Sequence, residues 1–576
     1  MLGLCPQKFM NKKRDIRGGK VLKKILISQL FLIITVGYGQ EWIARYQGPY
    51  GEDYANAIAV DNLKNVYVTG ASQGPGAGYI NDFTTVKYDS LGIEQWVARY
   101  NGSPTQNWPD EARAIAVDAN GVYVTGYISY YILADSSDYC TIKYNKETGD
   151  TLWVRTFNGP VDKCDQAYAI ALDGDGNVYV TGKSKGTGTD FDFLTIKYSP
   201  DGVEQWAARY NNPTGNGWDI AYALAVDNSG NVYVTGESYD PNTYYDCVTI
   251  KYNSSGVQQW VQRYSYEGNW SDEGNAITVD DTGNVYVTGR SVSTTTSWDY
   301  ITIKYNAGGT QQWATRYHGM ANYSDEPTGI ALDNLGNIYV IGKSGIDPLF
   351  RYQFATVKYT SNGIQEWVKT YIGPANLSAW ANAVVVDHQN NIYVTGLDYA
   401  SDTTAEYVTI KYSPNGTEEW IARYSAGVVQ GDDWATAVCV DQHNYIYVSG
   451  CSESLDGNPD YLTIKYSPSG PGIHECKQNF VMKNKLLQTT PNPFRNQVNI
   501  EWQMADELVK KGAVNLCIYD ITGTLVKQFN LITDKPSNRV TWDGTDNWRH
   551  GLPEGVYFVQ LESQDYKVTR KVVLLR

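Results

Sequence analysis

A tryptophan recurs along most of this chain at nearly constant spacing. Eight tryptophans follow one another every 53 to 57 residues. They are Trp42, Trp96, Trp153, Trp206, Trp260, Trp313, Trp367 and Trp420. Self-similarity at a fixed period means that one structural unit is repeated, and that each unit buries its apolar face against its neighbours. The chain is therefore expected to form a repeat architecture.

Each repeat contains four short segments with the composition of β-strands. The consensus is W-x-x-R/T-Y/F, a loop, A-x-A-I-A-V-D, a short turn, N-V-Y-V-T-G, a loop and D-Y-x-T-I-K-Y, as in residues 206–252. The apolar period is two rather than 3.6, which excludes a helical solenoid. Four strands per repeat make one propeller blade. The prediction is an all-β, eight-bladed β-propeller over residues 40–470; seven blades with one displaced repeat is the alternative.

The phase of the repeat predicts how the ring closes. The small residues of A-I-A-V suit the crowded axis, so the tryptophan strand is expected to be outermost. Residues 42–46 precede any inner strand, and the last repeat stops after residues 461–466 without a tryptophan strand. The first strand should therefore complete the eighth four-stranded blade, which removes the exposed edges of an open stack.

Turn residues assign the loops to two faces. An aspartate ends every inner strand and is expected to cap a tight hairpin by accepting backbone N–H bonds. The strand order puts both tight turns of each repeat on one face and the longer, variable loops on the other. Function usually lies in variable loops on a rigid scaffold. The lysine of each T-I-K-Y segment, such as Lys87, Lys143 and Lys197, recurs and is interpreted as part of the scaffold.

The motifs V-D-x-x-G-N-V-Y-V-T-G and D-Y-x-T-I-K-Y resemble the SBBP β-propeller repeat family over about residues 42–470. The resemblance implies a propeller, and the family name implies seven blades. Eight repeats are present here, so the chain departs from that blade number.

The N-terminal residues 1–39 are interpreted as a leader with a signal peptide. Two lysines precede an apolar run from Ile25 to Val36, followed by Gly37 and Gly39, and cleavage is expected before Gln40. The run is too short to span a bilayer, although a retained membrane anchor is the alternative. Because residues 1–20 fit no part of a signal peptide, we take Val21 as the true initiator. A peptide from residues 1–20 in mass spectrometry would refute this start site.

The composition changes after residue 470. Residues 471–488 are expected to be a linker, and residues 489–576 alternate like a small immunoglobulin-like β-sandwich. Pro491, Asn492, Pro493 and Phe494, followed by I-Y-D-I-T-G, W-D-G, G-V-Y-F and the terminal K-V-V-L-L-R, resemble the C-terminal sorting domain of type IX secretion cargo and the FlgD-type immunoglobulin-like domain. The resemblance implies export by the type IX secretion machinery, followed by removal of the domain or surface attachment; a permanent accessory domain is the alternative.

An acidic constellation recurs on the variable-loop face. In seven repeats an aspartate lies two residues ahead of the first small residue of the inner strand, and the seventh repeat has Ala379 there. The aspartates are Asp53, Asp110, Asp165, Asp219, Asp272, Asp325 and Asp433. In an eight-bladed ring they would circle the mouth of the central channel. They predict either a cation or polyol site or a repeated loop cap bonded to backbone N–H groups.

Tryptophans gather in the same variable loops and are candidate ligand-binding residues. They are Trp108, Trp218, Trp270, Trp380 and Trp434. Exposed tryptophans stack on sugars or anchor protein partners, and the alternative is simple packing within the loops. A glycan or a surface protein is therefore the expected partner.

The sequence contains little sign of catalytic or metal-binding motifs. The five histidines do not recur, none has H-E-x-x-H or H-x-H spacing, and no G-x-S-x-G or P-loop is present. Residues 173–177 read D-G-D-G-N, like a calcium loop, but Ser184 stands where the loop needs glutamate. We expect no cofactor and no metal.

Charge and cysteine content narrow the partners further. Residues 1–39 hold eight basic residues and one acidic residue, so the remainder has 39 basic and 61 acidic residues, a net charge of −22. Such a surface repels phosphate backbones, which excludes nucleic acid as a partner. The seven cysteines outside the leader lack C-x-x-C spacing and are interpreted as scattered core residues rather than a disulfide framework.

The sequence thus predicts a monomeric, secreted or cell-surface binding scaffold without enzymatic activity and without a transmembrane segment in the mature chain. Two alternatives stay open. One is a secreted carbohydrate-active hydrolase or lyase that uses carboxylates on the variable-loop face, and a carboxylate pair about 5–10 Å apart beside a groove would favour it. The other is a structural coat protein.

Overall fold

The computed structural model describes the following residues: 40–74, 81–102, 108–130, 136–266, 270–293, 297–319, 323–348, 351–401, 404–426, 431–454, 457–470, 487–490, 493–503, 514–521, 524–531, 537–547, 549–563 and 566–575. Within these ranges the chain forms 39 β-strands and no helix. It divides into two compact units, one built from β1 to β32 and the other from β33 to β39. The predicted leader and most of the predicted linker lie outside the described ranges. Among the described residues, no helix is long and apolar enough to cross a membrane.

The first unit consists, in its described residues, of eight antiparallel four-stranded sheets. From the inner to the outer strand they are, in order, β2 (Asp53–Val60), β3 (Val66–Gln73), β4 (Asn81–Tyr88) and β5 (Glu94–Tyr100); β6 (Glu111–Val117), β7 (Val122–Ser129), β8 (Ser137–Tyr144) and β9 (Thr151–Phe157); β10 (Asp165–Leu172), β11 (Val178–Lys185), β12 (Phe191–Tyr198) and β13 (Glu204–Tyr210); β14 (Asp219–Val226), β15 (Val232–Asp240), β16 (Tyr244–Tyr252) and β17 (Gln258–Tyr264); β18 (Asp272–Val279), β19 (Val285–Val292), β20 (Trp298–Tyr305) and β21 (Gln311–Tyr317); β22 (Asp325–Leu332), β23 (Ile338–Gly345), β24 (Tyr352–Tyr359) and β25 (Gln365–Tyr371); β26 (Ala379–Val386), β27 (Ile392–Ser401), β28 (Thr404–Tyr412) and β29 (Glu418–Tyr424); and β30 (Asp433–Val440), β31 (Ile446–Glu453), β32 (Pro459–Tyr466) and β1 (Gln40–Tyr46).

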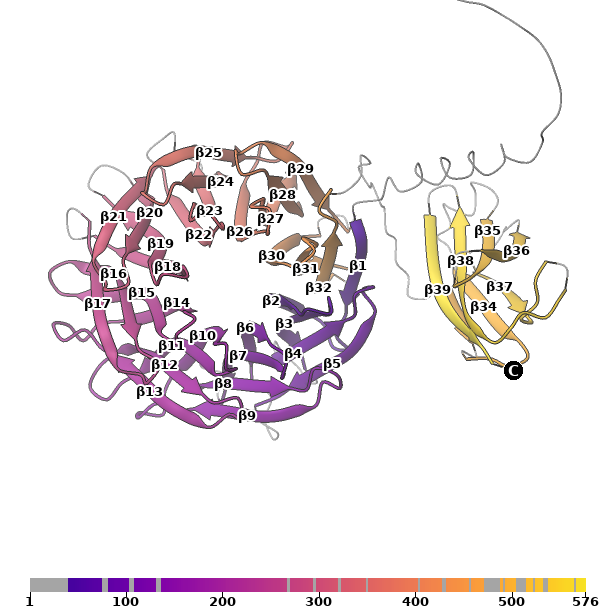
Figure 1. Ribbon diagram of the computed structural model, residues 1–576, viewed down its shortest axis with the longest axis horizontal. Coiled ribbons are helices and arrows are strands. Elements are labelled where there is room, and N and C mark those ends of the chain that lie inside the picture. Colours follow the sequence, from indigo (N-terminus) through magenta and orange to yellow (C-terminus); the bar gives the residue numbers. More distant parts are fainter. Residues whose placement is uncertain are drawn as a thin grey trace, which may run out of the picture. The chain divides into compact units, whose positions relative to one another are not determined.

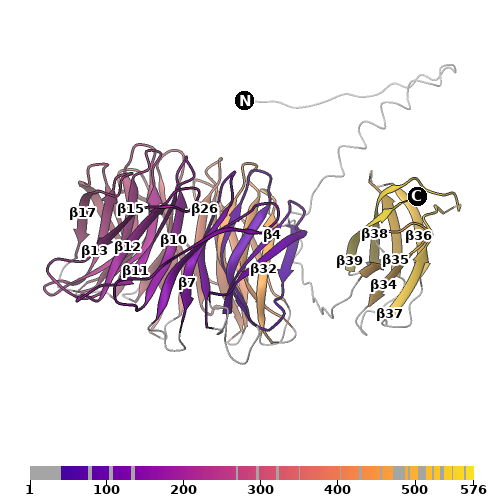
Figure 2. The ribbon, with the colours of Figure 1, turned by 90° about the horizontal axis from the view of Figure 1, so that it is seen from below.

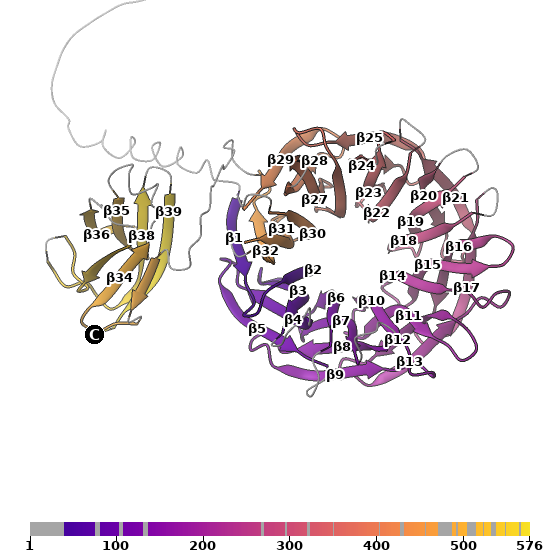
Figure 3. The same cartoon turned by 180° about the vertical axis from the view of Figure 1, so that it is seen from behind.

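The sheets stand around a common centre, with the inner strands towards it and the outer strands at the rim (Figure 1). Figure 3 shows the same arrangement from the opposite side, and Figure 2 shows the sheets from the side of the ring. Neighbouring sheets share hydrophobic clusters, such as the one that joins Tyr67 and Phe83 of the first sheet to Val122 of the second. The all-β, repeated four-stranded architecture predicted from the sequence is confirmed. In the eighth sheet β1 pairs antiparallel with β32, and Tyr46 lies opposite Tyr461.

An aspartate caps the hairpin between the first two strands of each sheet. Asp61 Oδ1 accepts the backbone N–H groups of Leu63 and Asn65, both at 2.9 Å, and its Oδ2 accepts the Tyr67 hydroxyl at 3.0 Å. The equivalent aspartates make the same backbone bonds: Asp118, Asp173, Asp227, Asp280, Asp333, Asp387 and Asp441. The segment 173–177 that looks like a calcium loop is therefore one copy of the hairpin cap that every sheet uses.

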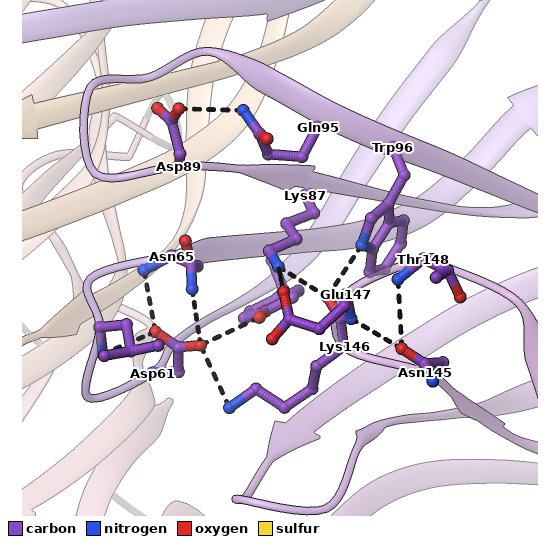
Figure 4. A network of polar contacts seen from close by, with 12 residues as sticks. Asp61, Asn65, Lys87, Asp89, Gln95, Trp96, Asn145, Lys146, Glu147 and Thr148 are labelled. Atoms are coloured by element: carbon purple, nitrogen blue, oxygen red, sulfur yellow. Dashed lines mark hydrogen bonds and ion pairs between the residues drawn. The ribbon is translucent and has the colours of Figure 1, made fainter.

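The recurring lysines and all but one of the recurring tryptophans donate a hydrogen bond to the neighbouring sheet; Trp420 Nε1 has no partner among the described residues. Lys87 Nζ and Trp96 Nε1 both donate to the carbonyl of Lys146 in the outer turn of the second sheet, at 2.6 and 3.0 Å (Figure 4). Lys146 Nζ in turn lies 3.1 Å from the carboxylate of Asp61. The other junctions use the carbonyls of Pro200, Ser254, Ala307, Ser361, Pro414, Pro468 and Ser90. Ser90 is the acceptor for Trp42 and Lys465, so the eighth sheet is joined to the first in the same way as the others.

A glycine in each outer turn packs against the tryptophan of the preceding sheet. Gly256 has φ of +79°, and a Cβ atom there would lie 2.6 Å from Trp206 Cδ2. The position therefore requires glycine for two reasons, the left-handed backbone and the close approach of an indole.

We expect Gly256→Ala to lower the free energy of unfolding by about 2–5 kcal/mol, because a left-handed alanine costs about 1–2 kcal/mol and overpacking about 1–3 kcal/mol. Gly188→Ala is the matched control, since Gly188 has φ of +80° with no atom within 4 Å of an added Cβ. The control should show only the backbone cost in denaturant unfolding followed by circular dichroism. Equal losses in the two variants would contradict a role for the indole contact.

Apolar and tyrosine side chains fill the space between the sheets. Some buried tyrosines place the ring in the core and the hydroxyl on a neighbouring sheet, as Tyr139 does with the Leu194 carbonyl at 3.1 Å and Tyr461 with the Thr84 carbonyl at 3.2 Å. Others, such as Tyr67, donate to the hairpin-cap aspartate of their own sheet. The cysteines that the structure describes are free: Cys140, Cys164, Cys247, Cys439, Cys451 and Cys517.

The second unit has two sheets that share one core. One sheet has the order β33 (Leu487–Thr490), β34 (Val498–Gln503) and β37 (Ser537–Trp542), and the other has the order β36 (Leu525–Leu531), β35 (Val514–Asp520), β38 (Gly555–Ser563) and β39 (Tyr566–Leu574). Phe494 is buried 5.4 Å from the Trp542 ring, and its N–H donates to the Val573 carbonyl at 2.9 Å. Of the predicted sorting motif, Pro493 is exposed, and Pro491 and Asn492 lie outside the described residues.

Candidate ligand-binding site

The seven aspartates that precede the inner strands are buried, with at most 1% of each residue exposed. Asp110 accepts the backbone N–H groups of Gly102 and Ser129, at 2.7 and 2.9 Å. Asp53, Asp165, Asp219, Asp272 and Asp325 likewise accept N–H groups from the incoming loop. These carboxylates accept hydrogen bonds from the loops that lead into the inner strands, as repeated loop caps do, and they are not exposed at a channel mouth. The residues described include no group of three or more His, Cys, Asp or Glu side chains able to hold a metal ion.

A second buried acid accompanies the loop cap in most sheets, and an arginine neutralises it. In the first sheet Arg99 Nη2 lies 3.0 Å from Asp82 Oδ2. The equivalent ion pairs are Arg45–Asp460, Arg209–Asp192, Arg263–Asp246, Arg316–Asp299 and Arg423–Glu406. They form the polar core of the variable-loop face.

Two sheets lack this arginine. In the sixth sheet Thr370 takes its place, and Gln353 takes the place of the acid, so the charges are lost together. In the second sheet Thr156 takes its place while Asp110 and Asp138 both remain. Burial raises the pKa of each of these two carboxyls to about 7. The second sheet thus carries two buried acids without a paired cation from its outer strand.

A cavity of about 500 Å³ opens at the inner strands of the seventh and eighth sheets. Its lining residues are Trp380 and Asn382 of β26, Leu397 and Tyr399 of β27, Ala405 of β28, and Asp432, Trp434 and Thr436 at and along β30. We call this cavity the aromatic pocket. Its volume falls within the range of about 300–1,000 Å³ that is usual for small-molecule sites.

Aromatic rings form the walls of the aromatic pocket. The Trp380 and Tyr399 rings meet edge to face with centroids 5.9 Å apart. Trp380 Nε1 is buried and has no hydrogen-bond partner among the described residues. Lys343 Nζ lies 5.8 Å from the centroid of the same indole.

Asp432 supplies a carboxylate to the aromatic pocket. Its Oδ1 accepts the Ala405 N–H at 2.9 Å. Two further hydrogen bonds join it to Glu453: the Glu453 N–H donates to the Asp432 carbonyl, and the Asp432 N–H donates to the Glu453 carboxylate. The carboxylate is therefore fixed in position on a half-buried loop end.

The polar side chains of the inner strands make the aromatic pocket rigid. Asn382 Nδ2 donates to the Ala435 carbonyl at 2.7 Å, which ties the seventh sheet to the eighth. Thr436 Oγ1 donates to the Ala55 carbonyl at 2.8 Å, which ties the eighth sheet to the first. Since these groups are already engaged and the Trp380 indole N–H is buried, the Asp432 carboxylate is the polar group best placed to meet a ligand.

The structure brings only two of the five predicted tryptophans together. Trp380 and Trp434 line the aromatic pocket, whereas Trp218 is 47% exposed against Phe191 and Trp270 is 53% exposed. Trp108 is half-buried and does not line the pocket. Sequence reasoning missed Tyr399 and Asp432, which lie in different repeats. The only signal for Asp432 is the doubled aspartate just before Trp434.

Two family models match the chain. The SBBP β-propeller repeat model matches residues 41–76, 162–191, 205–241, 259–294 and 312–350. The model of the secretion system C-terminal sorting domain matches residues 490–575. No curated protein matches the chain in sequence.

Solved structures show remote similarity. PorZ, an essential bacterial surface component of the type IX secretion system of Porphyromonas gingivalis, is 14% identical over 89% of this chain and 68% of its own, with a TM-score of 0.37. The β-propeller domain of the trilobed protease from Pyrococcus furiosus is 8% identical over 63% and 96%, with a TM-score of 0.36. An α-L-arabinanase from Penicillium chrysogenum is 10% identical over 51% and 91%, with a TM-score of 0.32. TM-scores below 0.5 do not establish a shared fold.

The family matches agree with the arrangement of the strands. Five of the repeats that build the four-stranded sheets are matched individually, and the sorting domain covers the whole described C-terminal unit except the first residues of β33. The sorting domain directs export through type IX secretion to the cell surface or the extracellular space. The chain is therefore a secreted protein of SBBP β-propeller repeats that ends in a type IX sorting domain.

Proposed function

We propose that the eight sheets form one closed, eight-bladed propeller and that this propeller is a non-enzymatic binding scaffold that holds a sugar ring of a glycan in the aromatic pocket. The pairing of β1 with β32 and the bonds from Trp42 and Lys465 to the first sheet support closure. The observation that carries the binding function is the pocket of about 500 Å³ lined by two indoles and one carboxylate.

A sugar ring matches this lining. Its C–H faces pack on aromatic rings, and its hydroxyls both donate and accept hydrogen bonds. The Asp432 carboxylate accepts such bonds, and the indoles of Trp380 and Trp434 supply the apolar contact. An organic cation would also suit the aromatic rings and the carboxylate, and binding to a glycan array distinguishes the two ligands.

The acid content of the aromatic pocket favours binding over hydrolysis. Asp432 is the one acidic side chain among the described residues that line it. Glycoside hydrolysis generally uses two carboxyl groups on either side of the scissile bond. A single carboxylate is enough to orient a bound sugar through its hydroxyls.

A glycan array probed with the full mature chain tests this function. We expect binding to at least one glycan, and a loss of about 30-fold in affinity in both Trp380→Ala and Trp434→Ala, the size of a strong interface aromatic. Trp218→Ala is the matched control, because this exposed indole lies outside the aromatic pocket, and it should bind like the unchanged protein. An array without signal, or an equal loss in Trp218→Ala, would contradict the proposal. Mass spectrometry showing shortened glycan after incubation would instead support the enzyme alternative.

A further inference from the structure

We infer that the aromatic pocket is one subsite of a longer surface that binds a chain of linked sugar units, and that Tyr54 forms the next subsite. The inference rests on the proposed function and extends it, because it gives the ligand a length and a direction across the seventh, eighth and first sheets. The surface formed by Trp380, Trp434 and Tyr54 is called the aromatic arc.

The aromatic arc arises from one repeated position. The second residue of the inner strand is Trp380 in β26, Trp434 in β30 and Tyr54 in β2, and each lies opposite the residue that follows the glycine of the next strand. In the remaining sheets this position holds a polar or aliphatic residue. Those residues are Glu111, Gln166, Ile220, Glu273 and Glu326. Aromatic residues thus occupy three consecutive sheets and no others, which sets this arc apart from the symmetric scaffold.

The rings of the aromatic arc adjoin one another across the sheet boundaries. Trp380 and Trp434 line the same cavity. The Trp434 and Tyr54 ring centroids are 6.4 Å apart with an angle of 35° between the rings. All three side chains are half-buried, so each keeps part of its surface exposed. The spacing between Trp434 and Tyr54 is close to the length of one sugar unit, so neighbouring units of one chain can contact neighbouring rings.

Tyr54 is held in place for such a contact. Its hydroxyl donates to the Glu52 carboxylate at 2.8 Å, and the adjacent Ala55 carbonyl accepts the bond from Thr436 of the eighth sheet. Because the ring is anchored at its tip and its strand is tied to the pocket wall, little conformational entropy is lost when a ligand packs against it.

Charged side chains mark the other end of the aromatic arc. Beyond Trp380 stands Lys343, whose Nζ lies 3.3 Å from the Glu326 carboxylate, and Arg290 is 3.5 Å from the same glutamate. These charges are paired with one another, and no aromatic residue continues the row in that direction at the equivalent position. A bound chain is therefore expected to extend from the aromatic pocket towards Tyr54.

Calorimetric titration with matched oligosaccharides tests this inference. The probes are glucose, mannose and N-acetylglucosamine and their β-1,4-linked dimers, trimers and tetramers, titrated into the full mature chain. For the series that binds, we expect affinity to rise at least tenfold from the monomer to the trimer. Tyr54→Ala should abolish this rise and leave monomer affinity unchanged, whereas Tyr54→Phe should retain it. Trp218→Ala serves as the control, and thermal unfolding checks that every variant is folded.

The possible failures are distinguishable. Equal affinities for all lengths in the unchanged protein, or an equal loss at every length in Tyr54→Ala, would overturn the extended site and leave the aromatic pocket standing. Absence of binding to every probe would overturn the proposed function itself.

Discussion

Replacing Arg45 by methionine should lower the free energy of unfolding by about 3–5 kcal/mol, the cost of leaving one partner of a buried ion pair without the other. Arg45 lies in β1, and its Nη1 is 2.9 Å from Asp460 Oδ2 in β32. The Asp460 side chain is fully buried. The same Nη1 also donates to the Ser452 carbonyl at 2.6 Å. One side chain therefore joins the first strand to the two that precede it in the eighth sheet.

Two matched variants show whether this loss reflects the eighth sheet. Arg209→Met breaks the equivalent pair with Asp192 within a sheet that is continuous in sequence, and it should cost a similar amount. Arg113→Met removes an arginine whose partner, Glu111, is 24% exposed, so it should cost at most about 1 kcal/mol. Denaturant midpoints followed by circular dichroism provide the measurement. If Arg45→Met were as mild as Arg113→Met, β1 would contribute little to the fold, and closure of the propeller would lose its main support.

Replacing Asp138 by asparagine should stabilise the protein above pH 7, by on the order of 4 kcal/mol. Burial raises the pKa of the Asp138 carboxyl, a hydrogen bond from Tyr130 lowers it and the neighbouring Asp165 raises it, so that the resulting pKa is about 7. In six of the other sheets an arginine faces the equivalent acid, but here Thr156 occupies its position. The folded pKa lies about three above the ordinary value, and each pKa unit corresponds to about 1.4 kcal/mol. The uncharged asparagine avoids this cost.

The pH dependence follows from the sign of the pKa change. A carboxyl whose pKa is higher in the folded than in the unfolded protein binds a proton more tightly when folded, so its contribution is complete below about pH 4. The contribution is lost as the pH rises towards about 7, and it stays lost above that value. The unchanged protein should therefore lose stability between pH 4 and pH 7 relative to Asp138→Asn, and the two should be equally stable near pH 4.

The same substitution in the third sheet is the control for Asp138→Asn. Asp192 is 2.9 Å from Arg209, so Asp192→Asn leaves a half-buried guanidinium without its partner. This variant should be destabilised at pH 8 by about 2 kcal/mol or more. Opposite signs for the two variants, measured by thermal unfolding from pH 4 to pH 8, are the expected result. A destabilised Asp138→Asn at pH 8 would show that another cation neutralises the second sheet.

The recurring residues explain why so much of the fold could be read from the sequence. Trp96 and Lys87 recur because each repeat must reach the same turn carbonyl of its neighbour, and Asp61 recurs because each hairpin needs the same cap. Interactions that are repeated in every unit produce a periodic pattern of residues, and such a pattern can be read from the sequence alone.

The residues of the candidate site do not follow such a periodic pattern and are harder to recognise in the sequence. Trp380 and Trp434 were recognised as two of five tryptophans in variable loops, but nothing in the order of residues separates them from the exposed Trp218 and Trp270. The sequence does not single out Asp432 and Tyr399, because each lines the pocket only together with residues of another repeat. The sequence also leaves open whether the aspartates before the inner strands are loop caps or surround the mouth of the channel, and the structure shows them buried.

The sequence alone determined the strands, their order, the repeat length and the sorting domain, since each of these depends on local patterning and on residues within one repeat. Only the tertiary structure decided which side chains from neighbouring sheets meet. The aromatic pocket, the aromatic arc and the unpaired acids of the second sheet all arise where one repeat departs from the consensus next to another. Such meetings depend on distances across sheet boundaries, which a periodic sequence does not encode.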